Sequence, residues 1–188
     1  MPLRPEMLAV NAEVIDRLGC SFDLDLEIDP AEPIWFSVDG TEGIEQFGRD
    51  GAGGVFSQLT DSARVLYVSS EGAAGVLAAD FDEFVELIVA CPYWQDVLKF
   101  SGRGNLEEMR RSAAWFETDS LDDEDLTEAR AFLKSQLGLT EQVDPVGGLH
   151  RAVTTSEVTV RTPDGEPCSS LFNRFTIDDN PMVRFRSG

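Results

Sequence analysis

The chain has 188 residues, 42% hydrophobic and 27% charged, and its 35 acidic residues against 15 basic ones give a net charge of −20. This length fits one domain, or one domain with an appendage, and the hydrophobic fraction suffices for a core. The acidic excess repels nucleic acid and anionic membrane, and it attracts basic partners. An acidic surface also promotes solubility, and composition leaves both explanations open.

The negative charge is unevenly distributed along the chain. Residues 147–188 hold five arginines and five acids, so the first 146 residues carry the whole imbalance. The three cysteines, Cys20, Cys91 and Cys168, form no CxxC pair, which favours a reducing compartment. We find neither a signal peptide nor an apolar run of membrane-spanning length, and we expect a soluble cytoplasmic protein.

The first fifty residues predict a short helix and then strands. The helix begins near Pro5, and an apolar stripe continues to Gly19. From Phe22 to Ile28 apolar and acidic residues alternate, which is typical of a strand with an acidic outer face. A second short strand is expected at Ile34–Val38, before an Asp-Gly turn.

The next segment predicts a β-meander. Strands are expected at Ile44–Phe47 and Val55–Leu59, on either side of a glycine-rich connection. Further strands are expected at Arg64–Ser69 and Gly75–Ala78, joined by a turn at residues 70–72.

Three helices are expected after the strands. Asp80 followed by Glu83 resembles a capping box, and the helix that it starts ends by Pro92. A second helix begins near Asn105. Seven acids between Glu117 and Glu128 lead into a third helix that ends at Gly138.

The end of the chain differs in pattern from the rest. Residues 144–148, Asp-Pro-Val-Gly-Gly, are the best candidate boundary, and they divide the chain into a main domain, 1–146, and an extension, 147–188. The extension predicts a β-hairpin packed on the main domain, with strands at Val153–Arg161 and Leu171–Ile177.

No motif in the chain supplies catalytic chemistry. The glycines from Gly48 to Gly54 lack the Lys-Ser/Thr and the following helix of a phosphate loop, so we interpret them as a turn. His150, the only histidine, sits in the expected linker. The acids at 122–125 lack the spacing of a calcium loop. We expect no enzyme activity, no cofactor and no metal.

Three stretches of the chain resemble the SMI1/KNR4 (SUKH) superfamily in their order and spacing. They are Gly51–Phe56, Val65–Gly72, and Phe81–Phe84 continued to Pro92-Tyr93-Trp94. The resemblance covers about residues 35–116. It implies an α+β fold with a mixed, largely antiparallel sheet flanked by helices. It also implies a non-enzymatic role, in bacterial members as an immunity protein.

The resemblance implies that the chain neutralises a toxin domain of the nuclease or deaminase type, by occluding a basic active-site cleft. A regulatory or scaffold protein of the same fold, without a toxin partner, is the alternative. An enzyme with a carboxylate-based site is a third hypothesis, but the spacing of the acids singles out no pair. Core packing is the ordinary explanation for adjacent aromatic pairs, and a binding hot spot of aromatic residues ringed by acids is the alternative. Five residues are expected near the binding face: Trp35, Asp39, Asp50, Glu71 and Trp94.

Overall fold

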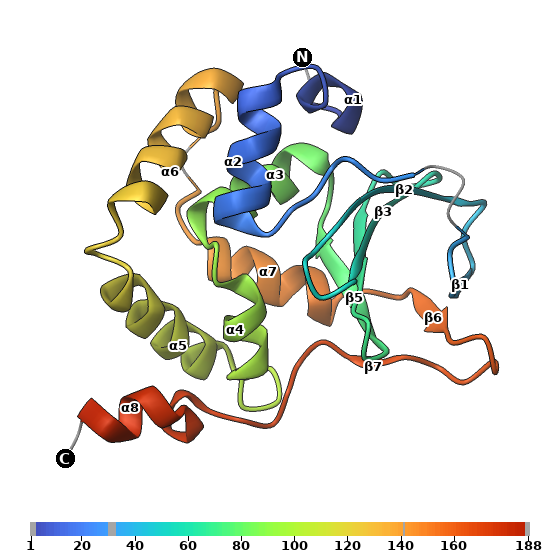
Figure 1. Cartoon of the computed structure of the whole chain (residues 1–188). Helices are drawn as coiled ribbons and strands as arrows, with labels where there is room; N and C mark the ends of the chain where they lie inside the picture. Colours follow the sequence, from blue (N-terminus) through green and yellow to red (C-terminus); the bar gives the residue numbers. More distant parts are fainter. Residues whose placement is uncertain (1–2, 30–32, 141, 187–188) are drawn as a thin grey trace.

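A computed structural model describes residues 3–29, 33–140 and 142–186 and shows an α+β fold. Figure 1 shows helices on one side of a central sheet and a small two-stranded ribbon on its other side. Within the described residues, no helix has the length and apolar character needed to cross a membrane.

The central sheet is mixed and largely antiparallel, as expected. Its strand order is β2-β3-β4-β5-β7, and only β5 and β7 run parallel. A register shift between Gln46 and Gly48 marks a bulge in β2. The strands are β2 (Ile44–Arg49), β3 (Val55–Leu59), β4 (Val65–Val68), β5 (Ala73–Ala78) and β7 (Ser169–Ser170).

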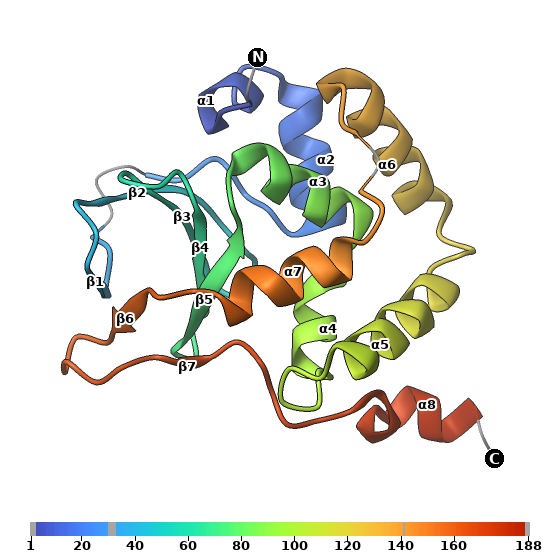
Figure 2. The same ribbon diagram turned by 180° about the vertical axis from the view of Figure 1, so that it is seen from behind.

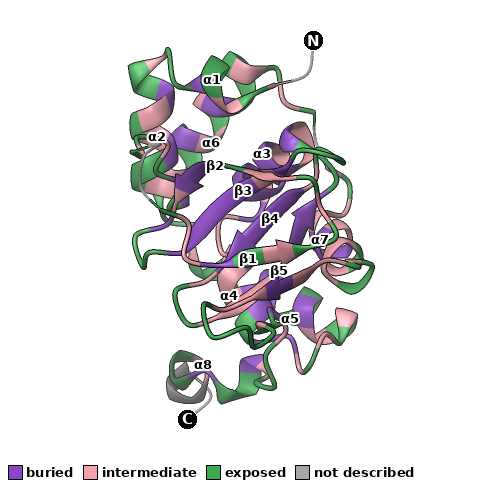
Figure 3. Ribbon diagram, turned by 90° about the vertical axis from the view of Figure 1, so that its right-hand side faces the viewer, coloured by how far each residue is buried: buried purple, intermediate pink, exposed green. Residues whose placement is uncertain are grey.

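The two faces of the sheet carry separate cores, because successive side chains of a strand point to opposite faces. Phe56 and Tyr67 point toward the helices, whereas Val55 and Leu66 point toward the ribbon. Strand β4 is buried on both faces, and Figure 3 shows the central strands as mainly buried.

The ribbon consists of β1 (Ser37–Asp39) and β6 (Thr159–Arg161), which pair antiparallel. Phe36 and Val160 are buried in the core that the ribbon shares with the sheet. Segments from both ends of the chain therefore join to cover this face. Their position beyond the sheet is clear in Figures 1 and 2.

The helices begin where side-chain caps satisfy their free N–H groups. Asp80, Asn105 and Asp123 each accept hydrogen bonds from the first turn of the helix that follows, and the first two stand where helix starts were expected. The helices are α1 (Pro5–Leu8), α2 (Ala12–Phe22), α3 (Phe81–Ala90), α4 (Trp94–Lys99), α5 (Leu106–Asp119), α6 (Glu124–Leu137), α7 (Pro145–Thr154) and α8 (Pro181–Arg186).

The strand expected at Phe22–Ile28 is wrong. Val14, Leu18 and Phe22 also follow the helical spacing, so α2 continues past Gly19 to Phe22. Asp23 then adopts a left-handed conformation, and Leu24 N–H donates to Leu18 C=O to close the helix. Beyond this point only a single bridge, Asp25 to Arg49, links the segment to β2.

The linker expected at residues 144–148 is also wrong, because these residues form the cap and first turn of α7. Asp144 accepts from Gly147 N–H, and Pro145 occupies the first helical turn. Val146 and Leu149 are buried in the main core. The expected boundary between residues 1–146 and 147–188 therefore falls inside a helix that packs on β5.

The expected C-terminal hairpin has a tight turn but a different return strand. Thr162 N–H bonds to Glu166 C=O, and Cys168 N–H bonds to Val160 C=O. The chain then joins β5 through β7. Residues 171–177, expected as a strand, instead pass the end of α4 and the loop that follows it. Asn173 N–H donates to Leu98 C=O in α4, and Gly102 N–H of the loop donates to Phe175 C=O. Helix α4 itself was not expected.

Candidate functional site

An acidic groove opens at one end of the sheet, between α1, the start of α3 and the strands β2 and β3. It has a volume of about 590 Å³. These elements lie next to one another at the upper end of the molecule in Figure 1. The groove is lined by Leu3, Arg4, Pro5, Glu6, Ala9, Leu26, Ile28, Glu45, Gln46, Phe47, Gln58, Leu59, Thr60, Ala63, Asp80, Phe81 and Asp82.

Three contacts between the lining elements hold the walls of the groove in place. Leu8 is buried and anchors α1 in the main core. Leu3 N–H donates to a carboxylate oxygen of Asp82 at 2.5 Å, which ties the chain before α1 to the first turn of α3. Glu45 lies opposite Gln58 in the β2–β3 pair, so both side chains face the same way.

Four carboxylates surround an apolar floor in this groove. Asp80 caps α3 by accepting from Glu83 N–H, and Asp82 accepts from Leu3 N–H in the segment before α1. In the part of the chain that the structure describes, no cation pairs with Glu6 or Glu45, and both residues are exposed. Among the described residues of the lining, Arg4 is the one that is basic. The groove therefore favours a positively charged ligand.

Gln46, one of the lining residues, has a side-chain amide nitrogen, Nε2, that is buried and has no hydrogen-bond partner among the described residues. A buried polar group without a partner costs stability, so it is uncommon in a folded protein. Gln46 lies opposite Ser57 in the β2–β3 pair, so its amide is on the other face of the sheet from Glu45, beside a Ser57 hydroxyl that also has no partner among the described residues.

Asp50 and Trp94, two of the expected binding residues, lie inside the molecule. Asp50 is 6% exposed and accepts hydrogen bonds from Gly54 N–H, Tyr67 Oη and Gln95 Nε2 at 2.7, 2.5 and 2.9 Å. Trp94 is 2% exposed and packs edge-on against Tyr67. We correct both predictions, because neither side chain is available to a partner.

The loop from Asp50 to Gly54 is built around this buried carboxylate. A Cβ on Gly54 would come within 2.5 Å of Tyr67 Oη and 2.6 Å of an Asp50 oxygen, so only glycine fits. Burial and the bond to Asp50 raise the pKa of the Tyr67 hydroxyl. Burial also raises the pKa of Asp23, whose carboxylate accepts from Gly51 N–H. The glycine-rich turn is therefore structural, as expected.

The other three expected binding residues are more accessible but do not form one face. Glu71 is exposed on the β4–β5 turn, near the Asp50 network. Trp35 is half-buried and packs edge-on against Phe36 in the ribbon core. Asp39 forms an ion pair with Arg161 across the ribbon at 2.6 Å. None of the five lines the acidic groove.

A second, smaller cavity of about 280 Å³ lies between α3, α5 and α6. Glu117 accepts two bonds from Arg130, at 2.9 and 3.0 Å, and a third from the Tyr93 hydroxyl. The Arg130 guanidinium holds the pKa of Glu117 below its usual range, although partial burial opposes this effect. Glu117 and Arg130 already pair with each other, although the Arg130 Nε atom is buried without a hydrogen-bond partner among the described residues. Because its main charges are paired, the cavity is a weaker binding candidate than the groove.

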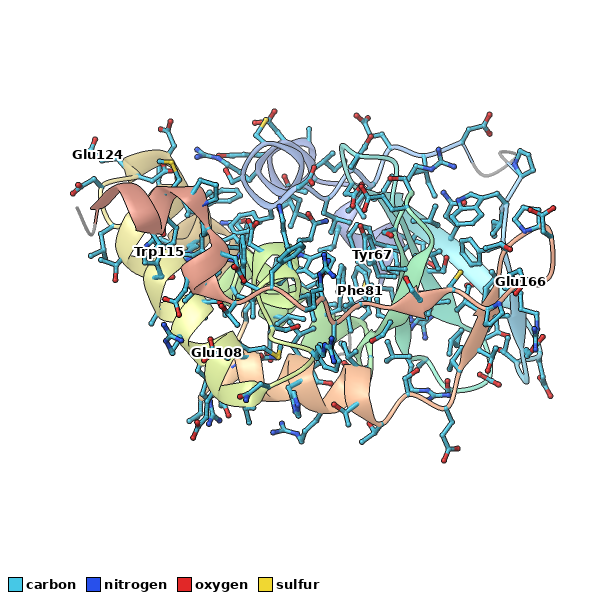
Figure 4. The ribbon with its side chains drawn as sticks, turned by 90° about the horizontal axis from the view of Figure 1, so that it is seen from below. Tyr67, Phe81, Glu108, Trp115, Glu124 and Glu166 are labelled. Atoms are coloured by element: carbon cyan, nitrogen blue, oxygen red, sulfur yellow. The ribbon has the colours of Figure 1, made fainter. Side chains whose placement is uncertain are left out.

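The remaining reactive side chains have structural surroundings. His150 lies on α7, where its Nε2 contacts Gly104 C=O and its ring packs on Phe172. No cluster of metal-ligating residues is found in the described ranges. Figure 4 shows Tyr67 and Phe81 in the interior, with Glu124 and Glu166 toward opposite ends of the molecule.

Comparisons of the chain with family models, with curated proteins and with solved structures find no match. The site therefore has to be argued from its own geometry. Sequence reasoning missed its main residues, Arg4, Glu45, Gln46 and Asp82. Glu45 stands beside Ile44 in a strand pattern, but nothing in the sequence brings these positions together.

Proposed function

We propose that the chain is a non-enzymatic binding protein of the immunity type, which neutralises a basic toxin domain of the nuclease or deaminase class. The acidic groove carries this proposal. Its rim offers carboxylates without cationic partners, and its floor includes the buried rings of Phe47 and Phe81. A protein that blocks a basic cleft must compete with a polyanion, and a field of carboxylates suits that task.

Two features of the sequence support the same proposal. The net charge of −20 raises the association rate with a basic protein. The resemblance to the SMI1/KNR4 superfamily between residues 35 and 116 points to binding rather than catalysis. A cytoplasmic location, where such a toxin would act on the cell that makes it, belongs to this proposal.

The test is capture of a partner by the tagged protein from its native cells, at low and high salt, with identification by mass spectrometry. A Glu6→Lys/Glu45→Lys variant reverses two groove acids. A matched Glu107→Lys/Glu157→Lys variant changes the net charge equally at exposed positions outside the groove.

We expect one dominant basic partner at low salt, captured by the wild type and the control but lost with the groove variant. Equal loss with both variants would show that overall charge, rather than the groove, attracts the partner. Several weak partners that are indifferent to either variant would favour the regulatory scaffold.

A further inference from the structure

We propose that the smaller cavity, between α3, α5 and α6, binds a zwitterionic small molecule with an apolar body, of the chemical class of an α-amino acid. This inference goes beyond the proposed function, because the cavity shares no lining residue with the acidic groove. Its volume of about 280 Å³ lies just under the usual range for small-ligand sites, about 300–1,000 Å³, so the ligand has to be small.

The cavity has apolar walls that a ligand can reach. Ala90, Tyr93, Leu139 and Pro145 line it, and each of them is only partly buried. They come from the end of α3, from the residue that caps α4, and from both ends of the segment that joins α6 to α7. A ligand with an apolar body therefore gains free energy by covering surface that faces water in the free protein.

Two of the four charged residues in the lining are committed to each other. The Glu117 carboxylate accepts from both Nη atoms of Arg130 and from the Tyr93 hydroxyl. Arg130 Nε, a donor, is buried without a partner among the described residues, so this pair adds a donor but no free charge. The pair fixes one wall of the cavity, and the other two charges decide which ligand it fits.

Lys134 and Glu86 line the same cavity but remain apart. No ion pair joins them, and Lys134 forms none with any other residue that the structure describes. Glu86 uses Oε1 to accept from the Thr140 N–H, at 3.1 Å, and from the Thr140 hydroxyl. Its Oε2 accepts nothing from the described residues. An ammonium group and a carboxylate oxygen are therefore both open, and a ligand that carries both signs complements them.

The charge of the whole chain favours a zwitterion over a simple ion. A net charge of −20 repels a free anion before it reaches Lys134. A simple cation beside Glu86 would meet the like charge of Lys134 in the same small cavity. A zwitterion carries no net charge, and it places its carboxylate against Lys134 and its ammonium group against Glu86.

The experiment measures binding of L-leucine and L-phenylalanine to the purified full chain by ligand-observed NMR titration. Two analogues of leucine, 4-methylpentanoate and 3-methylbutylamine, each lack one ionic group, and glycine lacks the apolar body. Lys134→Met and Glu86→Gln each remove one charge from the cavity. Lys99→Met and Glu107→Gln make the same changes at exposed positions outside it. Ala90→Leu fills the cavity, and thermal denaturation confirms that each variant is folded.

We expect at least one of the two amino acids to bind, and each cavity charge variant to weaken it about three- to tenfold, while the matched controls stay within about twofold. Each single-charge analogue and glycine should bind at least about threefold more weakly, and Ala90→Leu should abolish binding. The inference is overturned if neither amino acid binds at concentrations up to about 10 mM. It also falls if 4-methylpentanoate binds as well as leucine, or if folded Lys134→Met or Ala90→Leu binds like the wild type.

Discussion

The Asp50 network and the acidic groove both depend on carboxylates, but the carboxylates have opposite roles in the two regions. Asp50 is buried, and its carboxylate is saturated by backbone, hydroxyl and amide donors. Glu6 and Glu45 are exposed and have no such donors within the described part of the chain. The difference shows that a count of acids says little about function. A carboxylate with its donors built in holds the fold, whereas one without them is free for a partner.

The strongest test of this comparison is Asp50→Ala. The substitution leaves the Tyr67 hydroxyl, the Gln95 amide and the Gly54 N–H without their acceptor in a buried place. We expect a loss of about 3–5 kcal/mol in the free energy of unfolding, measured by urea denaturation. Glu71→Ala on the neighbouring turn is the control, with an expected change near zero. A loss for Asp50→Ala as small as that for Glu71→Ala would show that the network does not hold the fold.

Gly54→Ala tests the same network by crowding it. The added methyl group would overlap Tyr67 Oη and the Asp50 carboxylate, so the hydrogen bond between them has to distort. We expect a loss of about 1–3 kcal/mol, typical of overpacking in a well-filled site. Gly72→Ala is an instructive contrast, because its cost comes from a positive φ and not from contact. Full stability of Gly54→Ala would mean that this loop is not held by Asp50.

Glu117 is intermediate between buried Asp50 and the exposed groove acids, and the contribution of its ion pair to stability can be tested by changing the pH. Its side chain is 44% exposed, yet it pairs with Arg130, which lowers its pKa. For an acid with a lowered pKa in the folded state, the stabilisation is present above the unfolded pKa and is lost as pH falls through the folded pKa. Because the pair is partly exposed, Glu117→Gln should cost only about 1–2 kcal/mol at neutral pH.

The check on Glu117 is a series of urea denaturations between neutral and acid pH. The difference in stability between wild type and Glu117→Gln should shrink as pH falls, since the wild-type carboxylate gains a proton and loses its ion pair. A difference that stays constant with pH would assign the effect to the Tyr93 hydrogen bond instead of the charge.

Local chemistry explains why much of the fold follows from the sequence. The caps at Asp80, Asn105 and Asp123 and the left-handed Gly138 all mark helix ends through contacts with near neighbours. One error, the strand expected at Phe22–Ile28, fell where a single segment satisfies two patterns. Phe22 fits both the pattern of a strand and the apolar stripe of α2. It is buried together with Val14 and Leu18, and this packing stabilises the helix.

The groove could not be predicted in the same way, because it is assembled from distant segments. Glu6, Glu45 and Asp82 belong to α1, β2 and α3, and only the tertiary fold brings them to one cavity. The expected residues Asp50 and Trp94 lie in conspicuous turn and aromatic motifs. Those motifs stand out in the sequence because their residues build the core. The same residues are therefore buried, and the prediction that they bind a partner was wrong.

The double variant of the groove, which should weaken binding most, is expected to change the stability of the fold least. Glu6→Lys/Glu45→Lys removes no hydrogen bond from the described structure, so its free energy of unfolding should stay within about 0.5 kcal/mol of wild type in urea. The new positive charges also reduce self-repulsion in a chain of net charge −20. A loss comparable to that of Asp50→Ala would mean that the groove acids hold the fold, and the contrast between the two regions would disappear.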